Sequence, residues 1–170
     1  IGKIYNPPVN EVIGAEDEFY YRNKMEFSFG YDAEMNFTLG MHYPGRKFDI
    51  LDLDVCYLQS EFSVEVVNRT RELMKKLNWP PFKYSNGEGF LKGLFIREGR
   101  HTNEVMVNLA SSDDLPENFE KGLSEFVEVI TNISASKAIS VCWSKVISKR
   151  GSPRKIEENF LHGKKFLTEK

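Results

Sequence analysis

Apolar and polar residues alternate most regularly in the stretch YYRNKMEFSFG, residues 20 to 30. A period of two places successive side chains on opposite faces of an extended chain, which predicts a half-buried β-strand. The face expected to be buried carries Met25, Phe27 and Phe29, with Tyr21 and Asn23 before them. The opposite face carries Arg22, Lys24, Glu26 and Ser28. Two cations on one face and an amide between them are unusual for the start of a strand.

The pattern along the rest of the chain predicts further strands and two helices. Short apolar stretches separated by turn residues predict strands over residues 37–42, 48–56, 91–97, 104–109 and 138–147. Apolar residues at helical spacing predict a helix that begins after Ser60, a good N-cap, and ends at Trp79-Pro80-Pro81. A second amphipathic helix is predicted between Leu115 and Ile130.

From the strand at 48–56 onward, the predicted order of elements is β-α-β-β-α-β. This order is typical of the ferredoxin-like α+β fold, in which both helices cover one face of a four-stranded antiparallel sheet. The two earlier strands are expected to extend or flank that sheet. The other sheet face stays open to a partner, as in RRM domains, a comparison that rests on architecture alone.

The chain of 170 residues is long enough for one domain with a real core. We expect residues 1–19 to be a lead-in and residues 20–149 to form the α+β domain. Residues 150–170 are expected to be a connector, with a basic loop over 150–158 and a short element over 160–167. The chain has no initial Met and ends abruptly, so we expect it to be part of a longer protein.

The charge is distributed unevenly. The net charge of −2 argues against a dedicated polyanion-binding protein. Residues 145–170, however, hold eight Lys or Arg against three Glu, a local charge of +5 that leaves −7 elsewhere. This segment is either a local phosphate-binding surface or an ordinary solvated loop.

Cysteine content and hydropathy indicate the compartment. No apolar run approaches the roughly 20 residues that span a bilayer, so no membrane association is expected. Two widely separated cysteines, Cys56 and Cys142, do not make a disulfide framework, which favours a reducing cytoplasm.

Most catalytic motifs are missing from the sequence. It contains no G-x-G-x-x-G after a strand, no Walker motif, no H-E-x-x-H and no G-x-S-x-G. Asp52 and Asp54 share a strand face, an arrangement that is more typical of a solvated edge than of an acid–base pair. These observations disfavour a self-contained enzyme and leave a binding domain as the general interpretation.

Four stretches of the sequence, taken in order, resemble one protein family. They are YYRNKMEFSFG (20–30), LGMHYPGRKFDILDLDVCYLQ (39–59), REGRHTNEVMVNL (97–109) and LHGKKFLTEK (161–170). Each is similar to a motif of the RNA (uracil-5-)-methyltransferases, which make 5-methyluridine in tRNA or 23S rRNA. The first corresponds to the family's Tyr-Arg-Asn-Lys segment, and the third departs from the pattern by having Asn103 where glycine is usual.

The resemblance covers only the central domain of that family. It implies a substrate-recognition domain of an S-adenosylmethionine-dependent enzyme that acts on structured RNA in the cytoplasm. The TRAM barrel, the methyl-donor site, the nucleophilic Cys and the general base belong to parts without a counterpart here. We therefore expect those domains and RNA as partners, and no catalytic residue in this chain. The alternative is a stand-alone ferredoxin-like module that binds protein or RNA.

The resemblance also suggests site residues. It implies that Cys56 is the fourth ligand of a [4Fe–4S] cluster in members that have one, although Cys56 can equally be a buried structural residue. With one of four thiolates, this chain is expected to hold no cofactor itself. Arg22 and Lys24, about 7 Å apart along a strand, and Asn23 are expected either to contact RNA or to hold another domain. Arg46, beside a glycine turn, is the remaining candidate for RNA contact.

Overall fold

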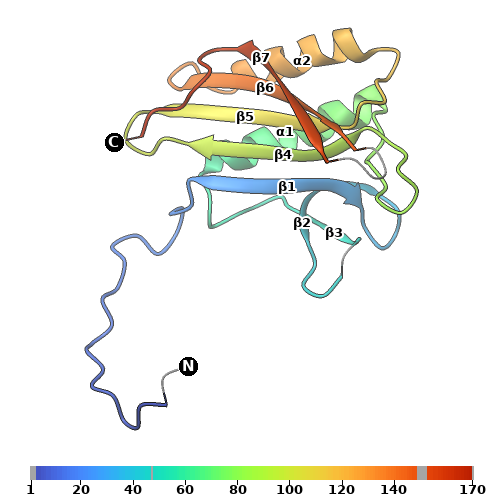
Figure 1. The fold of residues 1–170 in the computed structure, drawn as a ribbon. Helices are drawn as coiled ribbons and strands as arrows, with labels where there is room; N and C mark the ends of the chain where they lie inside the picture. Colours follow the sequence, from blue (N-terminus) through green and yellow to red (C-terminus); the bar gives the residue numbers. More distant parts are fainter. Residues whose placement is uncertain (1–2, 47, 149–152, 170) are drawn as a thin grey trace.

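The computed structural model describes residues 3–46, 48–148 and 153–169. Residues 3–23 contain no helix or strand, and the N-terminal part of this segment extends away from the sheet (Figure 1). The elements that follow are β1 (Lys24–Tyr31), β2 (Phe37–His42), β3 (Ile50–Asp52), α1 (Glu61–Leu77), β4 (Leu91–Glu98), β5 (Glu104–Ser111), α2 (Phe119–Thr131), β6 (Ala138–Ile147) and β7 (Lys155–His162).

The described strands form one seven-stranded sheet in the order β3-β2-β1-β4-β5-β6-β7. Both helices lie on the same face of this sheet, which confirms the predicted α+β class and the two strands that precede the β-α-β-β-α-β unit (Figure 1). The predicted four-stranded antiparallel sheet needs correction, because the sheet is larger and β5 runs parallel to β6. The crossover through α2 returns the chain in the direction of β5, as a parallel pair requires.

Two edge strands differ from the prediction. The strand expected over 48–56 is only Ile50–Asp52, because the Leu53 carbonyl accepts a hydrogen bond from Arg71 of α1 instead of continuing the strand. The basic loop expected up to residue 158 is largely wrong, since β7 begins at Lys155. The first residues of that expected loop, 150–152, lie outside the described residues.

Charge pairing explains why β7 adds to the sheet despite its polar sequence. Glu157 lies opposite Lys145 of β6, and its carboxylate is 2.8 Å from Lys145 Nζ and 2.7 Å from Lys155 Nζ. Hydrogen bonds from Lys145 and then Lys155 lower the pKa of Glu157 to about 2. The acids and bases that predicted a loop therefore pair with one another at a sheet edge.

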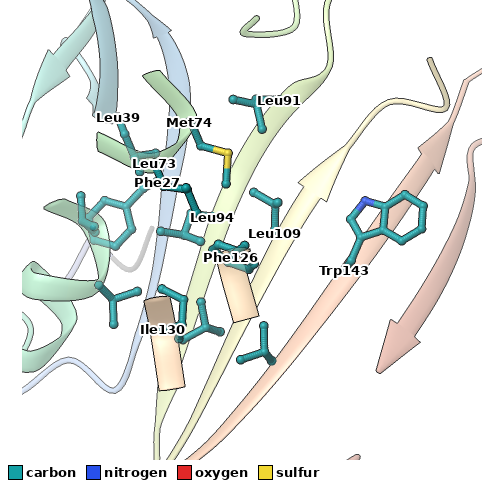
Figure 2. Close-up of a cluster of buried hydrophobic side chains, with 14 of the residues drawn as sticks. Phe27, Leu39, Leu73, Met74, Leu91, Leu94, Leu109, Phe126, Ile130 and Trp143 are labelled. Atoms are coloured by element: carbon teal, nitrogen blue, oxygen red, sulfur yellow. The ribbon is translucent and has the colours of Figure 1, made fainter. Parts of the chain in front are cut away.

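The core lies between the sheet and the two helices. Figure 2 shows side chains from β1, β4 and β5 directed toward those of α1 and α2. Members of this cluster include Phe27, Leu94, Leu109, Met74, Phe126 and Ile130. The alternating residues of β1 behave as predicted: Met25, Phe27 and Phe29 are buried among them. Burial of this apolar surface is the main force that holds the layers together.

Both ends of α1 match the sequence prediction. The Ser60 hydroxyl accepts a hydrogen bond from the Ser63 backbone N–H, and Asn78 ends the helix in the left-handed conformation with φ of 55°. Trp79 then packs edge-on against Phe90 at 5.0 Å between ring centroids. Within the described residues, no helix is long and apolar enough to cross a bilayer.

Candidate nucleic-acid interface

Arg22 lies just before β1 rather than within it. The backbone N–H of Arg22 donates to the Leu58 carbonyl, and that of Tyr20 donates to the Tyr57 carbonyl, each at 2.8 Å. The residues before β1 are therefore held against the segment that leads into α1. The Arg22 guanidinium contacts Met25 Sδ at 3.6 Å, and Met25 is one of the residues buried under the helices.

A polar cavity of about 210 Å³, here called the Arg22 pocket, opens at this point. Its lining comes from the segment before β1, the N-terminus of α1, the β4–β5 hairpin and the segment before β6. The lining residues are Tyr20, Arg22, Ser60, Glu98, Gly99, Arg100, Asn103 and Lys137. Three of these side chains are cationic and one is acidic, so the lining carries an excess of two positive charges.

The single acid of the Arg22 pocket already has partners. Glu98 is 7% exposed, and one carboxylate oxygen accepts hydrogen bonds from the hydroxyls of Ser60, at 2.7 Å, and Ser63. Its other oxygen lies 3.5 Å from Lys137 Nζ. Two guanidinium groups, those of Arg22 and Arg100, remain to face an incoming anion, and Arg100 Nη2 lies 3.5 Å from the exposed carboxylate of Asp17.

Lys24 and Arg22 are directed to opposite sides of the sheet. Lys24 Nζ lies 2.6 Å from Glu26 Oε1 on the open face, whereas Arg22 contacts Met25 on the helix side. The prediction that both cations share one strand face is wrong, because regular strand geometry begins only at Lys24. Asn23 joins this segment to β4 through its backbone, because its carbonyl accepts a hydrogen bond from the Glu98 N–H at 2.8 Å.

The structure adds a cation that the sequence analysis did not single out. Arg97 of β4 lies directly opposite Lys24 of β1, so the two cations are cross-strand neighbours on the open face. Arg97 and Arg100 belong to the β4–β5 hairpin, and Lys137 lies just before β6. No local sequence pattern links them to Arg22.

Arg46 lies elsewhere, in the turn between β2 and β3. Its Nη1 is 3.4 Å from Asp49 Oδ2, and its guanidinium carbon is 5.8 Å from the centroid of the Tyr43 ring. Arg46 does not line the Arg22 pocket. The four candidate residues therefore do not form one cluster, and their contact with RNA stays a prediction.

Comparisons with known proteins show which sequences and structures this chain is similar to. No family model matches the chain. An uncharacterized RNA methyltransferase of Clostridium tetani (strain Massachusetts / E88) is 35% identical over 124 residues, which are 71% of this chain and 26% of that protein. A second, from Chlorobaculum tepidum, is 33% identical over 126 residues, 66% of this chain and 26% of that protein.

A solved structure agrees with these relatives. The tRNA (uracil-54, C5)-methyltransferase of Pyrococcus abyssi, in complex with S-adenosyl-L-homocysteine, superposes with a TM-score of 0.62 and 25% identity. The match covers 91% of this chain and 34% of that one. The chain is homologous to one part of the RNA methyltransferases. The resemblance to the RNA (uracil-5-)-methyltransferases is thereby confirmed, and the chain spans 26% to 32% of the curated relatives.

The departure from the methyltransferase motif at Asn103 has a structural explanation. Asn103 ends the β4–β5 hairpin loop with φ of 58°, in the left-handed region that favours glycine. Asn is among the few other residues that adopt this conformation at low cost. Its side-chain amide also donates to the Ser136 carbonyl at 3.1 Å, which ties the hairpin to the segment before β6.

Cys56 is the residue that the family resemblance suggested as a cluster ligand, a role that stays a prediction. It lies between β3 and α1, half-buried, and packs against the core as a free thiol. Among the described residues, no group of three or more His, Cys, Asp or Glu side chains could hold a metal ion. One thiolate does not fit a [4Fe–4S] cluster, which takes four.

Proposed function

We propose that this chain is the RNA-recognition domain of an S-adenosylmethionine-dependent RNA uridine-5-methyltransferase that acts on tRNA or 23S rRNA. The observation that carries the proposal is the Arg22 pocket, a cationic cavity at the Tyr-Arg-Asn-Lys motif of a methyltransferase homologue. The solved neighbour, a tRNA uracil methyltransferase with S-adenosyl-L-homocysteine, supports this substrate and this methyl donor for the whole protein.

The chemistry of the Arg22 pocket suits a backbone phosphate. Arginine guanidinium groups present paired N–H donors that match two phosphate oxygens. Arg22 and Arg100 offer two such groups, and the occupied Glu98 does not repel an anion as a free carboxylate would. Lys24 and Arg97 continue the positive charge onto the open sheet face. Phosphate contacts of this kind fix the position of an RNA without reading its sequence.

In this function the domain positions RNA and another part of the protein carries out the methyl transfer. An enzyme that modifies a base must take that base out of its stack, so the surrounding RNA has to be held firmly. Cys56 would supply the fourth thiolate in a parent protein that carries a cluster. We place the parent protein in the cytoplasm.

The test is RNA binding by the 170-residue chain with Arg22 and Arg100 both changed to Ala. Fluorescence anisotropy with a tRNA transcript and an rRNA stem-loop gives the dissociation constants. We expect the double variant to bind at least about tenfold more weakly, since two charge-assisted phosphate contacts are lost. Arg69→Ala is the matched control, because Arg69 lies on α1 in an exposed pair with Glu65.

Two results would count against the proposal. One is a wild-type chain that binds neither RNA. The other is a double variant that keeps its fold by circular dichroism and binds as tightly as Arg69→Ala. A stand-alone module would bind without continuing into methyltransferase sequence, so the full reading frame of the parent protein separates these two interpretations.

A further inference from the structure

A second cavity, of about 300 Å³, lies near the opposite end of β1 and is here called the aromatic pocket. It is formed by the ends of β1 and β2, the segment around β3, and residues 81–85 before β4. Its aromatic lining consists of Phe29, Tyr31, Phe48, Phe82 and Tyr84. Tyr84 and Phe48 are each 62% exposed, which is unusual for large aromatic residues at the mouth of one cavity.

Contacts between the rings and with lysines hold the aromatic pocket in shape. Phe82 and Tyr84 meet edge to face at 5.0 Å between centroids. Lys92 Nζ lies 2.9 Å from the Phe82 centroid and 5.2 Å from that of Tyr84. Lys83 Nζ lies 5.9 Å from the centroid of Tyr31. The pocket therefore combines aromatic rings that contact one another with two ammonium groups.

Both acids in the lining already have polar partners. The Asp32 carboxylate accepts hydrogen bonds from the Asn36 side chain, at 2.9 Å, and from the backbone N–H groups of Asn36 and Glu34. Asp49 pairs with Arg46. Asp32 keeps its negative charge, whereas that of Asp49 is offset by Arg46, so Lys83 and Lys92 leave an excess of one positive charge among these groups. A flat, apolar group attached to an anion fits this combination.

A nucleotide has this combination of a planar base and a phosphate. Ser28 and His42, whose Oγ and Nε2 lie 3.1 Å apart on the pocket wall, add polar groups that can hydrogen-bond a base edge. Six residue steps along the chain, from Arg22 to Ser28, separate the two pockets by roughly 20 Å at the rise of a β-strand. A single strand of RNA that follows β1 and turns around its N-terminal end could reach both.

We propose that the aromatic pocket takes an unpaired base of the bound RNA, stacked on Tyr84, with an adjoining phosphate beside Lys83 and Lys92. This inference rests on the proposed function, because the RNA held at the Arg22 pocket is the same molecule. Stacking on an aromatic ring tolerates every base, so the pocket would select unpaired nucleotides rather than a particular sequence.

The test compares Tyr84→Ala with wild type on two RNA probes of equal length. One is a stem-loop with an unpaired loop, and the other is a fully paired duplex. We expect Tyr84→Ala to weaken stem-loop binding by about tenfold and to leave duplex binding unchanged, as loss of one base–aromatic stack predicts. Tyr84→Phe keeps the ring and should bind as wild type. Tyr5→Ala, at a 98% exposed tyrosine outside the sheet, is the matched control.

Each remaining outcome separates this inference from the proposed function. Suppose that Tyr84→Ala binds the stem-loop as tightly as wild type while the Arg22 and Arg100 variant does not. The inference that the aromatic pocket binds a base is then wrong, and the proposed RNA recognition stands. Equal losses of affinity for the stem-loop and the duplex in Tyr84→Ala would also contradict base binding in the aromatic pocket. If wild type binds neither probe, both proposals fall. Lys83→Glu, at a second residue of the pocket, should weaken stem-loop binding and gives an independent measurement.

Discussion

Lys92 is a half-buried cation whose ammonium group lies over the rings of Phe82 and Tyr84. Burial, and then the positive charge of Arg154, lower the pKa of Lys92 to about 8, while Asp113 opposes the shift. In the unfolded chain the same group titrates near 10.4. Below pH 8 the folded protein therefore carries a charged group in a site that disfavours charge.

Replacing Lys92 by Met should increase the free energy of unfolding at pH 7 by about 1 kcal/mol. This figure discounts the pKa shift for partial exposure and for the lost cation–π contact, which Met partly replaces through its sulfur. Between pH 8 and 10.4 only the unfolded wild-type chain keeps the proton, so wild-type stability rises with pH and the difference from Lys92→Met shrinks. Urea denaturation at pH 7 and 9.5 measures both effects. A variant less stable than wild type at pH 7 would contradict this account.

At the scale of elements, Arg71 joins α1 to the edge of the sheet. It is 4% exposed, and its Nε lies 2.7 Å from Asp52 Oδ1. Its Nη2 donates to the carbonyls of Leu53, at 2.7 Å, and Leu39, at 3.2 Å. One guanidinium thus satisfies acceptors on both β2 and the end of β3, which allows this short strand to stay in place.

Changing Arg71 to Met should destabilise the fold by about 3 to 5 kcal/mol, because acceptors that are buried with it lose their donor. Arg71→Lys should recover only part of the loss, since an ammonium group cannot reach Asp52, Leu39 and Leu53 together. Chemical denaturation measures the loss. Arg69→Ala on the exposed side of α1 should cost less than 1 kcal/mol. Similar stabilities for the Arg71 and Arg69 variants would show that this network does not anchor the helix.

At the scale of the whole molecule, a net charge of −2 coexists with a cationic region at one end of the sheet. This region comprises Arg22, Lys24, Arg97, Arg100 and Lys137. The net charge of this chain does not favour long-range attraction of RNA, because it is slightly negative. Binding has to come from local contacts that release counterions from the RNA phosphates.

The salt dependence of RNA affinity should report those contacts. Three to five phosphate contacts predict that the logarithm of the association constant falls with the logarithm of salt concentration, with a slope of roughly −2 to −4. Removing Arg22 and Arg100 should make the slope less steep by about 2. Anisotropy titrations between about 50 and 200 mM salt give both slopes. An unchanged slope in the double variant would place the phosphate contacts elsewhere on the molecule.

The sequence by itself determined the features that depend on neighbours along the chain. Alternation predicted the buried side of β1, helical spacing with Ser60 and Trp79 predicted the bounds of α1, and ordered motifs identified the methyltransferase relationship. Each of these signals is local, because side-chain periodicity and capping depend on residues only a few positions apart.

Only the tertiary structure decided which distant segments meet. The parallel pairing of β5 with β6, the addition of β7 and the turning of Arg22 toward Met25 depend on contacts across the chain. The same is true of both pockets, where Arg100 joins Arg22 and Tyr84 joins Tyr31. The local pattern of some polar residues predicts loops or solvated surface. Their actual positions depend on backbone pairing and core burial, which act between residues far apart in sequence.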